Sequence, residues 1–234
     1  MIDKPVMLIT GTSRGLGLNL AKHYSVNGFF VVGCSRNITT INNENFFHLS
    51  GDISDMDFIK SILNHIKTNY GRLDVLINNA GLSSALYLLM QSSKHINDVV
   101  NTNLIAALNM TRESVKLMKN NKFGRIINFS SVHVPLATEG TTIYSSIKAA
   151  IEQFSRIAAK EIAGYGITIN SLGLSLVNET GMVSDLSDKI KENIFSNLAI
   201  KKNLEIADII HLIDFIIDKK TNFITGQTIY TSGV

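Results

Sequence analysis

Short hydrophobic runs alternate along the chain with longer amphipathic stretches. Seven runs rich in β-branched and aromatic residues read as strands, at 6–10, 29–33, 46–49, 74–78, 125–130, 167–172 and 227–231. Between them, hydrophobic positions recur at three and four residues and predict helices near 15–27, 54–69, 92–119, 142–164, 184–197 and 205–218. Strands separated by helices indicate a parallel sheet covered on both faces. The pattern therefore predicts a doubly wound α/β fold with about seven parallel strands.

The pattern predicts one domain spanning residues 1–234. Only two prolines occur, and neither lies inside a predicted helix. No repeat, low-complexity linker or shift in composition marks a boundary. The least regular segments are 34–45 and 173–204, and irregular segments beside strand ends commonly carry binding loops. Within the second, residues 178–204 are expected to cover a substrate.

Composition narrows the class of protein. With 45% hydrophobic and 18% charged residues, the chain has the make-up of a globular protein in water. Its net charge of +3 is scattered, which argues against nucleic-acid binding. No signal-peptide pattern and no membrane-length apolar run occur, so no membrane association and a cytoplasmic location are expected. Cys34 is the only cysteine and reads as a packing residue, and the histidines lack metal-ligand spacing, so no metal site is predicted.

A glycine-rich turn directly follows the first predicted strand and opens a helix. It carries Gly11, Gly15 and Gly17 in the stretch "LITGTSRGLG". Glycines permit a tight turn and a close approach by a ligand, while the first turn of a helix offers free N–H groups and a positive dipole end to phosphate. The stretch therefore predicts a Rossmann-like dinucleotide site.

The spacing Thr10-Gly11-x-x-x-Gly15-x-Gly17 resembles the short-chain dehydrogenase/reductase family, in its compact single-domain branch. "GDIS" after the third strand, "NNAG" at 78–81 and the final "FITGQTIYTSGV" match the family in order, so the resemblance covers nearly the whole chain. It implies that a dinucleotide contacts Gly11, Ser13, Arg14, Gly15, Leu16, Gly17, Arg36, Asp52, Ile53, Asn79, Ala80, Gly81, Tyr144, Lys148, Val177 and Thr180.

The end of the second strand selects the form of the cofactor. An acidic residue there binds the free 2′-hydroxyl of the adenosine ribose in NAD(H), whereas basic residues bind the 2′-phosphate of NADP(H). No Asp or Glu occurs after this strand before Glu44, while Arg36 follows the strand and Arg14 lies in the glycine turn. Because an arginine fork suits phosphate, the sequence predicts NADP(H) over NAD(H).

The stretch "TTIYSSIKAA" places Tyr144 and Lys148 four residues apart, on one helix face. The resemblance implies that Tyr144 is a proton donor, that Ser131 in "NFSS" binds the substrate oxygen, and that Asn103 positions a water that links Lys148 to solvent. A cation about 4 Å from a phenol, at an effective dielectric near 20, lowers its pKa by roughly two to three units before burial acts. Lys148 is therefore expected to make Tyr144 more acidic.

The chain looks most like the 3-oxoacyl-acyl-carrier-protein reductases, which implies reduction of a 3-ketone on an acyl carrier protein, with Lys122 and Arg125 as basic contacts to the carrier. A polyketide, sugar or ring ketone and a non-catalytic NADP-binding sensor stay open. His133 is a candidate to face the substrate. Leu174 and Ser175 replace the family's Pro-Gly pair, which predicts a looser turn beneath the nicotinamide. The resemblance also implies a homo-oligomer, tetramer or dimer, formed through helices 92–119 and 142–164.

Overall fold

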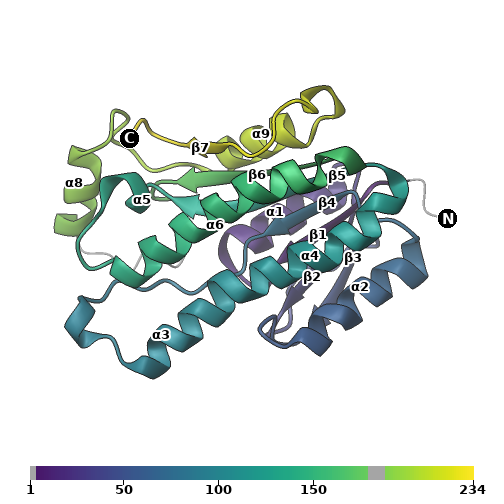
Figure 1. Cartoon of the computed structure of the whole chain (residues 1–234), viewed down its shortest axis with the longest axis horizontal. Coiled ribbons are helices and arrows are strands. Elements are labelled where there is room, and N and C mark those ends of the chain that lie inside the picture. The colour runs from purple at the N-terminus through teal and green to yellow at the C-terminus, as the bar shows by residue number, and fades with distance from the viewer. Residues whose placement is uncertain (1–3, 179–187) are drawn as a thin grey trace.

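A computed structural model describes residues 4–178 and 188–234 and contains one seven-stranded parallel sheet (Figure 1). All seven predicted strands are present, each within two residues of its predicted bounds. They are β1 (Val6–Thr10), β2 (Phe30–Ser35), β3 (Phe46–Ser50), β4 (Val75–Asn78), β5 (Gly124–Ser131), β6 (Ile167–Leu174) and β7 (Thr228–Tyr230). The predicted doubly wound fold is confirmed.

The strand order is β3-β2-β1-β4-β5-β6-β7, so the chain reverses direction across the sheet between β1 and β4. In open α/β sheets a crevice forms at the carboxyl ends of the strands flanking such a reversal. The carboxyl ends of β1, β4 and β5 carry the glycine turn, "NNAG" and Ser131 respectively. The topology therefore brings three of the predicted motifs to one edge of the sheet.

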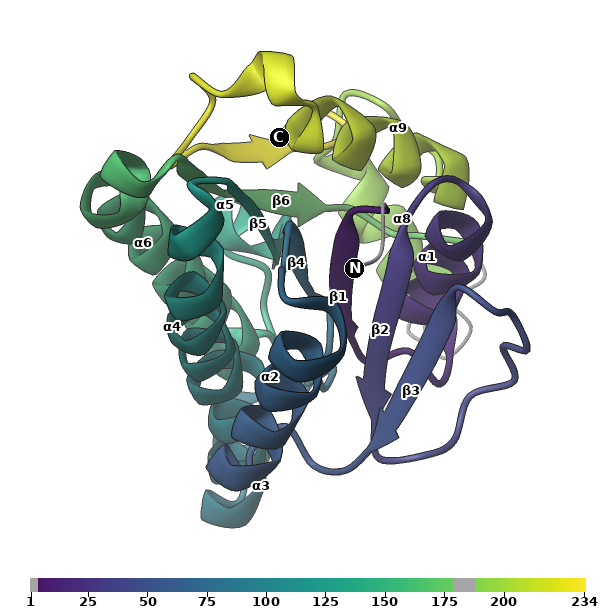
Figure 2. The same cartoon turned by 90° about the vertical axis from the view of Figure 1, so that its right-hand side faces the viewer.

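Helices cover both faces of the sheet (Figure 2). One face packs against α2 (Met56–Tyr70), α4 (Ala106–Met118) and α6 (Thr142–Ile162). The other packs against α1 (Gly15–Val26) and α9 (Ile206–Ile217). A smaller apolar cluster joins α5 (His133–Leu136), α8 (Asp188–Ser196) and the segment after β6. Because each layer buries an apolar face, the central strands read as continuous hydrophobic runs.

The helix predicted over 92–119 is interrupted. It consists of α3 (Ser93–Val100), a π-helical turn η2 (Asn101–Ile105) and α4. Figure 1 shows the three as one rod. The remaining short helices are η1 (Leu88–Met90), η3 (Lys119–Asn121), η4 (Ala163–Tyr165) and η5 (Lys219–Thr221). A hydrophobic period of three to four residues does not distinguish a π-turn from an α-turn, so this break was not predictable from the pattern.

The burial of Cys34 and Arg125 tests how the sequence analysis interpreted these two residues. Cys34 is fully buried in β2, as expected of a packing residue. Arg125, interpreted as a surface contact for a carrier protein, is only 2% exposed, and that interpretation is wrong. Its guanidinium lies over the Phe123 ring at the beginning of β5. Ser131 ends the same strand six residues later, about 20 Å away, so Lys122 and Arg125 lie at the opposite edge of the sheet from the predicted reacting centre.

Among the described residues, no helix is both long and apolar enough to cross a membrane.

Candidate functional site

The turn between β1 and α1 is tightly built around its glycines. Gly11 adopts a positive φ of 78°, and its N–H donates to the Cys34 carbonyl at 2.7 Å. A Cβ on Gly17 would lie 2.3 Å from both the Asn79 amide nitrogen and the Gly11 carbonyl oxygen. Gly15 also has a positive φ, 58°, but a Cβ there would meet no atom within 4 Å. The first and third glycines are thus required by packing, while the second faces open space.

The segment "NNAG" joins the end of β4 to this turn. The backbone N–H groups of Asn79 and Ala80 donate to Thr10 Oγ1 at 3.0 and 2.9 Å, and the Asn79 amide donates to the Thr10 carbonyl at 2.8 Å. Asn78 points elsewhere, into a buried polar network through Thr111 and Asn128. Asn79 and Ala80 therefore shape the cleft, and Asn78 stabilises the sheet.

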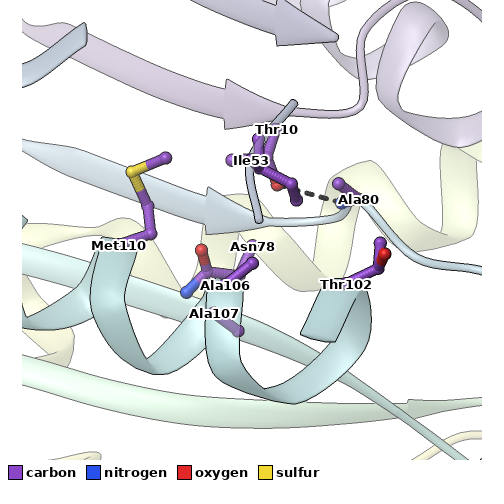
Figure 3. A pocket seen from close by; sticks show the side chains of 8 residues that line it. All are labelled: Thr10, Ile53, Asn78, Ala80, Thr102, Ala106, Ala107 and Met110. Carbon is purple, nitrogen blue, oxygen red and sulfur yellow. Dashed lines mark hydrogen bonds between the residues drawn. The ribbon is translucent and has the colours of Figure 1, made fainter. Parts of the chain in front are cut away.

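A small pocket opens between the carboxyl ends of β1 and β4 and the beginning of α4 (Figure 3). It is lined by Thr10, Ile53, Asn78, Ala80, Thr102, Ala106, Ala107 and Met110. Predicted residues Ile53 and Ala80 lie on its wall. Five of these eight residues are apolar, so the pocket offers few polar groups to a ligand.

Predicted phosphate-binding residues surround the end of β2. Arg14 and Arg36 are both exposed, and neither has an ion-pair partner within 4 Å among residues 4–178 and 188–234. The Asp52 carboxylate accepts hydrogen bonds from the N–H and hydroxyl of Ser54. The backbone bond is the main cause that holds the pKa of Asp52 below its ordinary value, and the nearby Arg36 guanidinium adds to it. Both arginines are thus available to an anion.

Ser131 and Tyr144 come together from different elements. Ser131 ends β5 and Tyr144 lies in the first turn of α6, and the Ser131 side chain is near enough to the phenol to lower its pKa. Tyr144 is half-buried, and its ring meets the His133 ring edge-on, with centroids 6.4 Å apart. β1 and β5 are separated by one strand, so this pair of hydroxyls lies about 10 Å from the glycine turn.

Lys148 lies beside Tyr144 as predicted, but its electrostatic effect differs from the expectation. Its ammonium lies 5.5 Å from the centre of the Tyr144 ring and donates to the Phe129 carbonyl at 2.6 Å. Burial lowers the pKa of Lys148 to about 8. Burial also raises the pKa of Tyr144 to about 12, and the nearby Ser131 hydroxyl offsets this only in part. The pKa of Tyr144 therefore lies above its ordinary value and not below it as expected, because removing the phenolate from water outweighs the attraction of the ammonium.

Asn103 lies in the π-helical turn and is 4% exposed. Its side-chain amide pairs with the backbone of Leu82 in both directions, at 2.8 and 2.7 Å. The turn closes with the Ala106 N–H donating to the Asn101 carbonyl, five residues back, instead of the usual four. Such a turn leaves a backbone carbonyl without its helical partner, and π-turns are frequent at functional sites. Asn103 therefore anchors the segment that follows "NNAG" to this special turn.

The segment after β6 is tied to the C-terminal tail. The Ser175 N–H donates to Thr231 Oγ1 at 3.0 Å, and the Ser175 and Ser232 hydroxyls are 2.8 Å apart. Val177 is buried and pairs with Leu204 in an isolated parallel bridge. Predicted contact Thr180 lies outside the described residues. Ser175 thus forms hydrogen bonds to the C-terminal tail, which the prediction of a looser turn did not take into account.

Two contributors to the site had no assigned role in the sequence analysis. Thr10 accepts hydrogen bonds from the two N–H groups of "NNAG", and the carbonyl of Phe129 accepts one from Lys148. The ring of His133, which was a candidate to face the substrate, borders Tyr144. The position of Thr10 directly before the first glycine is a signal that the sequence shows. The carbonyl of Phe129 leaves no such signal, because every residue carries a backbone carbonyl.

Comparison with known proteins identifies the family that the sequence motifs resemble. The family model "short chain dehydrogenase" matches residues 5–191. The 3-oxoacyl-acyl-carrier-protein reductase FabG of Haemophilus influenzae is 31% identical, with 97% of this chain and 96% of the relative covered. FabG of Buchnera aphidicola is 32% identical, with 98% and 96% covered.

Solved structures agree with the sequence comparison. ElxO with NADP bound superposes with a TM-score of 0.88 at 28% identity, covering 97% of this chain and 96% of that one. A tyrosine-to-phenylalanine variant of ElxO with NADPH bound gives the same values. The match of fold, motifs and family model leads to one conclusion: this chain belongs to the short-chain dehydrogenase family.

Proposed function

We propose that the protein reduces a ketone to a secondary alcohol with NADPH. The observation that carries the proposal is the trio of Ser131, Tyr144 and Lys148, assembled from β5 and α6 at the sheet edge that also holds the glycine turn. Related proteins support it, since the matched ElxO structures hold NADP or NADPH and the FabG relatives are named reductases.

The residues present fit a phosphorylated dinucleotide. Gly15 faces open space at the beginning of α1, whose first turn contains no acidic side chain. The free N–H groups and the positive dipole end at the beginning of α1 suit a pyrophosphate. The residues proposed to hold it are Gly11, Ser13, Gly15, Leu16 and Gly17. Arg14 and Arg36 suit the 2′-phosphate. Asp52, Ile53, Ala80 and Gly81 are proposed to surround the adenosine end, and Val177 the nicotinamide end.

When bound, NADPH supplies the hydride that reduces the carbonyl carbon. Ser131 and Tyr144 then hold the carbonyl oxygen between their hydroxyls, and Tyr144 gives its proton to that oxygen. A pKa of about 12 keeps the phenol protonated near neutral pH, so the proton is present before the reaction begins. Since an alkoxide is a stronger base than a phenolate, the proton moves downhill.

Lys148 and Asn103 support the Ser131 and Tyr144 hydroxyls. The Lys148 ammonium stabilises the phenolate that remains after proton transfer, through its position beside the Tyr144 ring. It is also proposed to hold the ribose hydroxyls of the cofactor. Asn103, in the π-turn, is proposed to position a water that returns a proton through Lys148.

The proposed substrate is a 3-oxoacyl thioester on an acyl carrier protein. The support is the named activity of the FabG relatives at about 30% identity. A polyketide, sugar or ring ketone is the alternative, because the same side chains perform the same reduction on any of them. No surface contact for a carrier is assigned, since Lys122 and Arg125 lie at the wrong edge of the sheet.

A panel of ketones tests the proposal. Wild-type protein with NADPH is followed at 340 nm, the absorbance of the reduced nicotinamide, against acetoacetyl thioesters, a ring ketone and a keto sugar. We expect turnover with at least one ketone and the highest kcat/KM for the thioester. Tight NADPH binding with no turnover on any ketone would instead identify a cofactor-binding sensor.

Titration of Lys148 predicts an alkaline limb in the pH profile. Its folded pKa is lowered to about 8, so the ammonium is present below that pH and is lost above it. We expect kcat/KM for NADPH to fall about tenfold per pH unit well above pH 8. Lys148→Arg is the control, since a guanidinium stays charged and should remove the limb even if the rate is lower. A wild-type limb that begins only near pH 10 would contradict the lowered pKa.

The protein is further proposed to be a homo-oligomer, tetramer or dimer, that pairs through α4 and α6. Ile105 at the end of η2, directly before α4, and Ile157 on α6 are 41% and 49% exposed, respectively. A partner covering them would bury apolar surface that now faces water. Light scattering measures the assembly directly.

A cytoplasmic location, a single domain and a covering role for residues 178–204 stay predictions.

A further inference from the structure

The segment that carries Arg36 leaves the sheet at the carboxyl end of β2, beside the edge strand β3 (Figure 2). Hydrogen bonds hold the backbone on both sides of Arg36. Before it, the Ser35 carbonyl accepts from the Gly51 N–H at 3.0 Å. After it, the Asn37 carbonyl accepts from the Ser35 hydroxyl at 2.8 Å, which closes a turn around Arg36. The direction in which the Arg36 side chain leaves the backbone therefore depends on the Ser35 hydroxyl.

The Ser35 hydroxyl is itself oriented by a histidine of β3. His48 Nε2 lies 2.8 Å from Ser35 Oγ. A serine hydroxyl has one hydrogen, and the Asn37 carbonyl can only accept it, so Ser35 Oγ accepts from a proton on His48 Nε2. The two contacts are satisfied together only in this arrangement. The chain of hydrogen bonds thus runs from His48 through Ser35 to the residue that follows Arg36.

The imidazole of His48 is held in place by its surroundings. His48 is half-buried, its ring stacks on the Phe46 ring with centroids 6.3 Å apart, and Ser35 is 7% exposed. A hydrogen bond shielded from water in this way is stronger than one on the surface. Burial also lowers the pKa of His48, so the ring is neutral at neutral pH and adds no charge beside Arg36. An effect of His48 on a bound anion therefore acts through the position of Arg36.

We propose that His48 is a positioning residue for recognition of the 2′-phosphate of the cofactor, because it holds Arg36 toward that phosphate through the Ser35 hydroxyl. The inference rests on the proposed use of NADPH and adds a residue that contacts neither cofactor nor substrate. NADH has no 2′-phosphate. Loss of the bond between His48 and Ser35 therefore weakens NADPH binding and leaves NADH binding largely unchanged.

Binding of the two cofactors tests this role without any turnover. Isothermal titration gives the ratio of the NADH Kd to the NADPH Kd for wild type, His48→Phe, His48→Gln and Ser35→Ala. Phenylalanine keeps a ring against Phe46 but has no donor, whereas glutamine places an amide N–H near the Nε2 position. Ser35→Ala removes the same bond from its other end, so the comparison does not depend on one variant folding. His65→Gln is the matched control, because His65 stacks on Phe47, whose side chain lies on the opposite face of β3 from His48.

For His48→Phe we expect this ratio to fall about fivefold, the effect of losing one hydrogen bond, with the NADH Kd changed less than about twofold. His48→Gln should return the ratio to within about twofold of wild type, and Ser35→Ala should lower it at least as far as His48→Phe. The double variant His48→Phe/Ser35→Ala should match Ser35→Ala, because His48 acts through that hydroxyl. His65→Gln should leave the ratio unchanged.

An unchanged ratio in His48→Phe would overturn the inference, and so would an equal loss of affinity for both cofactors, which is the result expected of a residue that only packs the edge of the sheet. Additive losses in the double variant would also overturn it, since His48 would then act by another route. Wild-type protein that binds NADH as tightly as NADPH overturns the inference together with the choice of cofactor. Protein that shows the expected ratios but reduces no ketone overturns the proposed reduction alone and leaves the role of His48 standing.

Discussion

Replacing Tyr144 by phenylalanine is expected to lower kcat for ketone reduction by about a thousandfold. The substitution removes only the hydroxyl that lies near Ser131 and would protonate the substrate oxygen. The ring remains to pack against His133, so the fold should be unaffected. The readout is steady-state NADPH oxidation with the most active ketone of the panel, together with the Kd for NADPH from fluorescence titration.

The binding measurement separates catalysis from cofactor binding. Tyr144→Phe should change the NADPH Kd by less than about threefold, because the main phosphate contacts lie about 10 Å away at the glycine turn. Tyr165→Phe is the matched control, since Tyr165 is an exposed tyrosine in η4 and its variant should be fully active. Turnover by Tyr144→Phe within tenfold of wild type would assign the proton donor to another group.

Replacing Arg36 by alanine is expected to weaken NADPH binding by about 30- to 100-fold while changing NADH binding less than about threefold. A charge-assisted hydrogen bond to phosphate contributes about 1.5–3 kcal/mol, and NADH has no 2′-phosphate to receive it. Arg36 has no ion-pair partner among the described residues, so its removal leaves no buried charge behind. Isothermal titration with both cofactors gives the two ratios.

The salt dependence gives an independent check on phosphate recognition. Added salt should weaken NADPH binding to wild type more steeply than to Arg36→Ala, because the variant has lost one screened charge contact. Arg156→Ala is the matched control, since the exposed Arg156 side chain bonds Gln153 within α6. Equal losses for NADPH and NADH in Arg36→Ala would mean that Arg36 supports the loop and does not read the phosphate.

The local features of this chain were predictable because they depend on neighbouring residues. All seven strands were recognised from short hydrophobic runs, and the glycine turn from its position between strand and helix. The i, i+4 spacing of Tyr144 and Lys148 sufficed to place them on one helix face. The order of motifs along the chain was enough to identify the family, since parallel strands carry successive motifs to the same edge of the sheet.

Other properties depend on what distant segments place around a residue. Arg125 looked like a surface cation in the sequence, but its position in a central strand buries it, with its guanidinium over the Phe123 ring. The pKa of Tyr144 rises because α6 carries the phenol out of water, an effect that no spacing reveals. Ser175 is held by Thr231 and Ser232, which lie more than fifty residues along the chain. The sequence alone thus determined the strands, the glycine turn and the shared helix face of Tyr144 and Lys148. The tertiary structure decided the burial, charge state and hydrogen bonds of the side chains, because solvation depends on the whole surrounding fold.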